Sequence, residues 1–101
     1  MKAYLIDAKN QTVEPIDVSD VDDVIKAVGY DTLESDSVGD SGDRLFFDEE
    51  CFIRGSEGRF QVDSLIPVSG NGVVVGSNEE GTELSDVLIS QDALLNRIKY
   101  L

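Results

Sequence analysis

The chain of 101 residues contains no histidine, no tryptophan and a single cysteine, and it has eight lysine and arginine residues against 21 aspartate and glutamate residues. Histidine is the commonest general base and metal ligand, so its absence excludes Ser-His-Asp and Cys-His nucleophilic machinery within one chain. The lone Cys51 cannot form an internal disulfide, which indicates a reducing compartment. The few basic residues are scattered among acids, so no basic stripe favours direct binding of DNA or RNA.

Long hydrophobic runs are also missing. No segment approaches the roughly 20 apolar residues that cross a bilayer, and Asp7 and Lys9 break the apolar run near the N-terminus, unlike in a secretory signal. We therefore expect a cytoplasmic protein without membrane contact. The length and the 41% hydrophobic content predict a single domain, residues 1–101, built around one core.

What the chain has in excess is negative charge, with a formal net charge of -13. Most of it lies between Glu14 and Glu50, where 13 acidic and two basic residues leave a net charge of -11. Repulsion among these like charges destabilises the folded state, so the charge pattern needs an explanation: a cationic partner, bound cations or imitation of a polyanion. Helix-start and turn positions account for about half of the excess. We predict that the remaining acids form a partner-binding acidic face: Glu34, Asp36, Asp40, Asp43, Asp48, Glu49 and Glu50.

The clearest helix signal follows Ser19, which we expect to be the N-cap. Val21, Val24, Ile25 and Val28 recur at helical spacing, acids fill the first turn, and the glycine at position 29 is placed to end the helix. A second helix is predicted after the cap at position 90, because four apolar side chains share one helical face: Leu94, Leu95, Ile98 and Leu101.

Short strands are predicted through the rest of the chain, separated by turns rich in glycine and acids. The expected strands span Lys2–Asp7, Thr12–Ile16, Tyr30–Val38, Arg44–Asp48, Cys51–Arg54, Arg59–Val62 and Val73–Val75, and the segment from Leu84 to Ile89 fits either a strand or a helical turn. The fold class is therefore α+β: a small antiparallel sheet of about six short strands with two helices.

Three motifs resemble functional sites. The segment 39–42 is similar to the nucleophile region of trypsin-like proteases, but without a histidine Ser41 is a turn residue. The glycines around Asn71 echo a nucleotide loop, yet three valines follow where a helix must start. Asp36, Asp40 and Asp43 bracket a loop without calcium-loop spacing, so they are candidates for an adventitious cation site only.

The segment from Phe47 to Gly81 carries four short motifs. They are Phe-Asp-Glu-Glu at 47–50, Gly-Arg-Phe at 58–60, Ile-Pro at 66–67 and Gly-Val-Val-Val-Gly followed by an acidic turn at 72–81. In this order the segment resembles small uncharacterised proteins of phages, plasmids and bacterial genomes that are grouped as a domain of unknown function. The resemblance implies an accessory protein of mobile DNA and transfers no catalytic residue.

We therefore expect a protein without catalysis or cofactors, monomeric or homodimeric, whose acidic face binds a basic protein partner. In a narrower version the partner is a nucleic-acid-binding protein and the face imitates a polyanion. One alternative is a small metal-dependent hydrolase that uses carboxylates between Asp36 and Glu50. Another is a structural homodimer that pairs through a strand edge or the apolar C-terminal helix face.

Overall fold

The centre of the molecule is a six-stranded antiparallel sheet, described by a computed structural model that covers residues 1–101. The strand order is β2 (Thr12–Asp17), β1 (Lys2–Asp7), β7 (Asn71–Ser77), β4 (Asp43–Asp48) and β3 (Leu33–Val38), with β8 (Leu84–Ser85) paired to the end of β7. With two helices, this sheet confirms the predicted α+β class.

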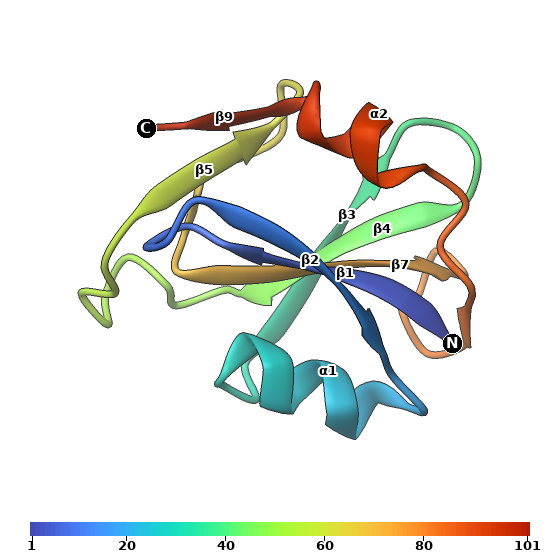
Figure 1. The fold of residues 1–101 in the computed structure, drawn as a ribbon. Helices are drawn as coiled ribbons and strands as arrows, with labels where there is room; N and C mark the ends of the chain where they lie inside the picture. Colours follow the sequence, from blue (N-terminus) through green and yellow to red (C-terminus); the bar gives the residue numbers. More distant parts are fainter.

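The sheet is covered on both faces, as Figure 1 shows. Helix α1 (Val21–Val28) lies on one face, and a second antiparallel sheet lies with helix α2 (Gln91–Leu95) on the other. The second sheet has the order β6 (Val68–Ser69), β5 (Arg59–Val62), β9 (Ile98–Tyr100). No helix is long and apolar enough to cross a membrane.

Each face of the central sheet has its own core, because successive side chains of a strand point to opposite faces. In β7, Val73 and Val75 pack in the cluster that includes Val24 and Val28 of α1, whereas Val74 packs with Phe60 of the second sheet. All three valines are fully buried. This double burial explains why the central strand reads as a continuous apolar run.

Helix α1 begins one residue later than the sequence indicated. Asp20 is the N-cap: its carboxylate accepts a hydrogen bond from the backbone N–H of Asp23 at 3.1 Å, and the Asp23 carboxylate accepts from the N–H of Ser19 at 2.8 Å. Gly29 ends the helix with a φ of 99° and donates to the Ile25 carbonyl at 2.7 Å. The predicted helix is confirmed, with its cap shifted.

The second helix is much shorter than predicted. It ends at Leu95, and the residues that follow form β9, in which Ile98 pairs with Val62 of β5. This pairing gives the backbone groups of β5 hydrogen-bond partners, which they would lack if residues 98–100 continued the helix. Leu94 is buried but Leu95 is 45% exposed, so the apolar helical face expected at the C-terminus does not exist.

The segment 51–54 was predicted to be a strand and is instead a series of turns. The N–H of Cys51 donates to the Asp48 carbonyl at 3.0 Å, and the N–H of Ile53 donates to the Glu50 carbonyl at 3.0 Å. These bonds span three residues each, which is the pattern of tight turns. Phe52 and Ile53 consequently face solvent.

The two edges of the central sheet are closed by side chains. On β3, the Thr32 carbonyl accepts from Glu49 of the β4 side, so by antiparallel alternation the backbone of Ser35 points to the free edge. Arg44 donates to that Ser35 carbonyl at 2.9 Å and to the hydroxyls of Ser35 and Ser37 at 3.0 Å each. The centre of the β3 edge is therefore occupied.

The opposite edge, β2, is closed in a different way. Val18 donates to the Met1 carbonyl, so alternation turns the backbone of Val13 and Pro15 outward. Proline has no N–H to offer, and the Val13 carbonyl accepts from the side-chain amide of Gln91 at 2.8 Å. Such features prevent edge-to-edge pairing of sheets.

Candidate functional site

The acids between Glu14 and Glu50 do not share one surface. Glu14 and Asp17 lie on edge strand β2, whereas Glu34 and Asp36 lie on edge strand β3, with three strands between them. Strands lie ~4.8 Å apart, so the two edges are separated by roughly 19 Å. Negative charge therefore surrounds the sheet.

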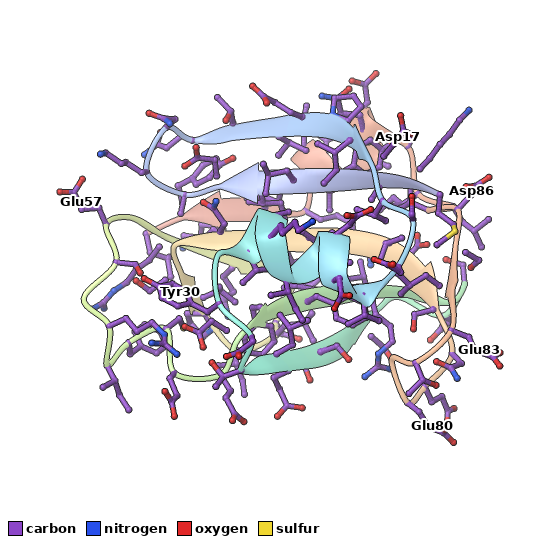
Figure 2. All side chains as sticks on the ribbon, turned by 90° about the horizontal axis from the view of Figure 1, so that it is seen from below. Asp17, Tyr30, Glu57, Glu80, Glu83 and Asp86 are labelled. Carbon is purple, nitrogen blue, oxygen red and sulfur yellow. The ribbon has the colours of Figure 1, made fainter.

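Further acids ring one end of the molecule. Figure 2, viewed from the α1 side, shows Asp17, Glu80, Glu83 and Asp86 pointing outward there, while Glu57 projects at the opposite end. Four of these five lie outside the acidic stretch, and Glu80, Glu83 and Asp86 come from the segment between β7 and α2. The negative charge of the surface therefore comes from several separate segments of the chain.

Asp43 was predicted to belong to the acidic face but is 1% exposed. Its carboxylate accepts hydrogen bonds from the backbone N–H groups of Leu88 and Ile89 at 2.9 and 2.8 Å. It thereby ties the irregular segment before α2 to the hairpin of β3 and β4. Because both oxygens are used inside the fold, Asp43 offers no carboxylate to a partner, and this part of the prediction is corrected.

Asp48 is also removed from the surface, at 3% exposed. It accepts hydrogen bonds from the Thr32 hydroxyl, the Glu50 N–H at 3.0 Å and the Arg54 guanidinium at 2.5 Å. Burial alone raises the pKa of Asp48, but these hydrogen bonds and the Arg54 charge outweigh it and hold the pKa below its usual value. Asp48 is thus an ionised anchor of the 48–54 turns.

Arg54 also forms an ion pair with a second acid of the predicted face, Glu50. Its guanidinium lies 3.3 Å from the Glu50 carboxylate and stacks on the Tyr30 ring at 4.0 Å from the ring centre. The hydrogen bond to Asp48 raises the pKa of Arg54. Glu50 therefore faces solvent beside an intramolecular cation that it shares with Asp48.

Three acids of the predicted set remain together and free. Glu34, Asp36 and Glu49 line one groove of about 310 Å³ between β3 and the loops on either side of β5. None of their carboxylates makes a hydrogen bond or an ion pair within the chain. The other residues that line the groove are all apolar: Phe47, Cys51, Phe52, Ile66 and Pro67.

Asp40 lies elsewhere, at the tip of the β3–β4 hairpin, in a polar cleft of about 300 Å³ shared with Glu79 and Arg44. The three cation candidates Asp36, Asp40 and Asp43 are consequently divided between two clefts, and no group of three acidic or thiol side chains is arranged to hold a metal ion. The structure does not bring these candidates together.

A larger cleft of about 480 Å³ near Tyr30 has no free charge. Lys9 pairs with Glu57 at 3.5 Å, and Asp7 accepts from the backbone and side chain of Asn10 at 3.1 and 2.8 Å. Burial raises the pKa of Asp7, and the Asn10 hydrogen bonds with the nearby Lys9 charge bring it below the usual value. The charged groups of this cleft therefore already have hydrogen-bond or ion-pair partners within the chain.

The apolar wall of the acidic groove was not found from the sequence. Phe52 was placed in the predicted strand 51–54 and Ile66 was noted only in the Ile-Pro motif, but they are 48% and 63% exposed. The available signal was the shortness of the apolar run at 51–53, which has acids before it and a glycine turn soon after it. A short run between acids and a glycine turn fits a series of turns as well as a strand.

Comparisons of the chain with protein-family models, with curated proteins and with solved structures gave no match. The resemblance of the segment 47–81 to proteins of mobile DNA therefore stays a prediction.

Proposed function

We propose that the protein is a non-catalytic binding protein that engages a basic segment of a partner protein through the groove beside β3. The observation that carries the proposal is the set of three unpaired carboxylates, from Glu34, Asp36 and Glu49, in a groove with no basic lining residue. The other groups of the predicted face are buried, ion-paired or at the far end of the hairpin.

Electrostatics support this choice of site. The charge repulsion among unpaired carboxylates is relieved when a cation binds between them, whereas an acid already paired with arginine gains little from a second cation. Phe52 and Ile66 add apolar surface to the same groove, so a protein segment can gain contact area there that a free cation cannot.

In the narrower version of the proposal, the partner is a nucleic-acid-binding protein and the chain imitates a polyanion. The acids on both sheet edges and around the end shown in Figure 2 favour this version, because they would present negative charge along an extended path. Association with mobile DNA rests on the sequence resemblance alone.

The two alternatives have less structural support. A hydrolase would need its carboxylates to converge, yet Asp43 and Asp48 are occupied by backbone and arginine partners and lie at opposite ends of β4. A homodimer through the C-terminal helix face would need a helix that the chain does not form beyond Leu95.

The test compares two triple variants with equal net charge. Glu34→Gln, Asp36→Asn and Glu49→Gln remove the groove charges, and Glu14→Gln, Asp17→Asn and Glu83→Gln remove exposed charges elsewhere. The probe is the fluorescent peptide Lys-Ser-Lys-Ser-Lys-Ser-Lys, followed by anisotropy. Exposed charge pairs contribute ~0.2–1 kcal/mol each, so the groove variant should lose about tenfold in affinity. Equal losses in both variants would overturn the proposal.

The polyanion version has its own test. Binding of a nucleic-acid-binding partner recovered from lysate should be competed by duplex DNA and should weaken steeply between roughly 0.05 and 0.5 M salt. Binding that is insensitive to both would remove this version and leave the groove proposal to the peptide experiment.

A further inference from the structure

The groove is lined by two chemically different groups of side chains. Glu34 and Asp36 come from β3 and Glu49 follows β4, whereas Phe52, Ile66 and Pro67 come from the loops before and after β5. Phe52 and Ile66 belong to different loops and line the same groove, so they form shared apolar surface rather than isolated exposed side chains. A ligand that fills the groove meets carboxylates beside β3 and β4 and apolar surface from the loops that flank β5.

The spacing of the acids suggests the conformation of the ligand. Glu34 and Asp36 are two residues apart on β3 and project to the same face, which places their Cα atoms ~6.7 Å apart. Alternate residues of an extended peptide have the same separation. A segment running along β3 therefore places two of its side chains opposite these two carboxylates.

The residue between those two side chains points the other way in an extended chain. It is available to the apolar wall that Phe52 and Ile66 contribute from the loops that flank β5. Arg59 already stacks on the Phe52 ring at 5.1 Å from its centre, and a further cation on this wall would meet that positive charge. An apolar side chain therefore suits this wall better than a charged one.

The backbone of β3 does not supply the recognition. Ser35 would be the central acceptor for an added strand, but its carbonyl is bonded to Arg44. Strand addition would have to displace a guanidinium that makes three hydrogen bonds to β3. Side chains of the partner must therefore carry the interaction.

We infer that the partner segment is an extended basic–apolar–basic triplet, with its lysine or arginine side chains on Glu34 and Asp36 and its apolar side chain against Phe52 and Ile66. This inference rests on the proposed function and names the chemistry of its partner. The charge complementarity of the groove favours such a segment over a second copy of this acidic chain.

The experiment compares the affinities of two peptides, Lys-Ser-Lys-Leu-Lys-Ser-Lys and the serine peptide Lys-Ser-Lys-Ser-Lys-Ser-Lys. Burial of the leucine should strengthen binding to the unmodified protein about tenfold. Phe52→Ser and Ile66→Ser should reduce this ratio to about one. Leu88→Ser is the matched control, because Leu88 is 66% exposed and lies outside the groove, and it should leave the ratio unchanged.

The outcomes separate the two proposals. If both peptides bind equally and the serine variants have no effect, while the groove-charge variant still loses binding, the triplet is wrong and the proposed function stands. If neither peptide binds, or if the groove-charge and control variants lose equally, the proposed function fails and the triplet fails with it. Sedimentation showing a dimer that Ile66→Ser dissociates would assign the groove to a second copy instead.

Discussion

Asp43 should be among the most important single side chains for the stability of the fold, although it is one of 21 acids in an acidic chain. Its carboxylate is 1% exposed and accepts two backbone hydrogen bonds, from Leu88 and Ile89. Hydrogen bonds to charged groups contribute ~1.5–3 kcal/mol each. Asparagine keeps one weaker acceptor and turns an N–H₂ toward the second donor, so Asp43→Asn should cost about 2–4 kcal/mol.

The matched control is Asp40→Asn. Asp40 lies in the same hairpin, is exposed and makes no hydrogen bond or ion pair, and its substitution changes the net charge by the same amount. Its effect should stay within ~0.5 kcal/mol. The comparison therefore cancels any relief of general charge repulsion.

Urea denaturation measures both variants. With a slope of ~1–3 kcal/mol per molar urea, Asp43→Asn should lower the midpoint by about 1–2 M. Amide hydrogen exchange should also accelerate at Leu88 and Ile89, whose N–H groups lose their acceptor. Similar unfolding free energies for the Asp43 and Asp40 variants would refute the reasoning.

Further predictions concern pH, backbone geometry and a buried hydroxyl. Folding lowers the pKa of Asp48, so its contribution to the free energy of unfolding is present above the unfolded pKa of ~3.9 and is lost as the pH falls through the folded pKa. In urea titrations at decreasing pH, Asp48→Asn should therefore lose less unfolding free energy than the unmodified protein. Equal losses in the two proteins would contradict this. Gly58→Ala should cost at least ~2 kcal/mol, because φ is 80° and a Cβ would lie 2.5 Å from the Ala8 carbonyl carbon. At Gly29 a Cβ meets nothing, so Gly29→Ala should cost only ~1 kcal/mol by the same assay. Tyr100→Phe should leave the unfolding free energy within ~0.5 kcal/mol or raise it, because the hydroxyl is buried without a hydrogen-bond partner; a loss above ~1 kcal/mol would show a partner.

Local patterns predicted the elements whose stability is local. Helix α1 has its own cap, its own apolar stripe and a terminal glycine with positive φ, so its sequence contains nearly all of its determinants. Central strand β7 was predicted because a strand that is buried on both faces has consecutive apolar residues, here three valines. These elements were predicted within one or two residues.

The C-terminus was not predictable in the same way. Leu94 and Ile98 are spaced as in a helix, yet Ile98 belongs to a strand because β5 offers it a pairing partner more than 30 residues earlier in the chain. Periodicity cannot represent such a distant partner. The strand predicted at 51–54 was wrong because side-chain bonds decide the structure there. The Asp48 carboxylate accepts hydrogen bonds from the Glu50 N–H and the Arg54 guanidinium, and apolar periodicity does not reveal such bonds.

For the candidate site, the sequence indicated which residues are acidic but not which of them are free. Glu49 and Asp48 are neighbours in sequence, yet one is exposed and unpaired and the other is buried in a network with Arg54. The alternation of β4 and the position of distant donors decide this, and neither is visible in composition. Only Glu34, Asp36 and Glu49 remain from the larger set as groove residues.

Two independent safeguards oppose self-association of this acidic chain, and Arg44 provides one of them. One is long-range repulsion, which weakens as salt shortens the Debye length from ~10 Å at 0.1 M to ~3 Å at 1 M. The other is the hydrogen-bonded cover over the Ser35 carbonyl, which is local and far less sensitive to salt. At low ionic strength the first safeguard is sufficient, and at high ionic strength only the second remains. In concentrated salt, protection against edge-to-edge pairing thus depends on local covers, Arg44 on β3 and Pro15 with Gln91 on β2, rather than on the acids.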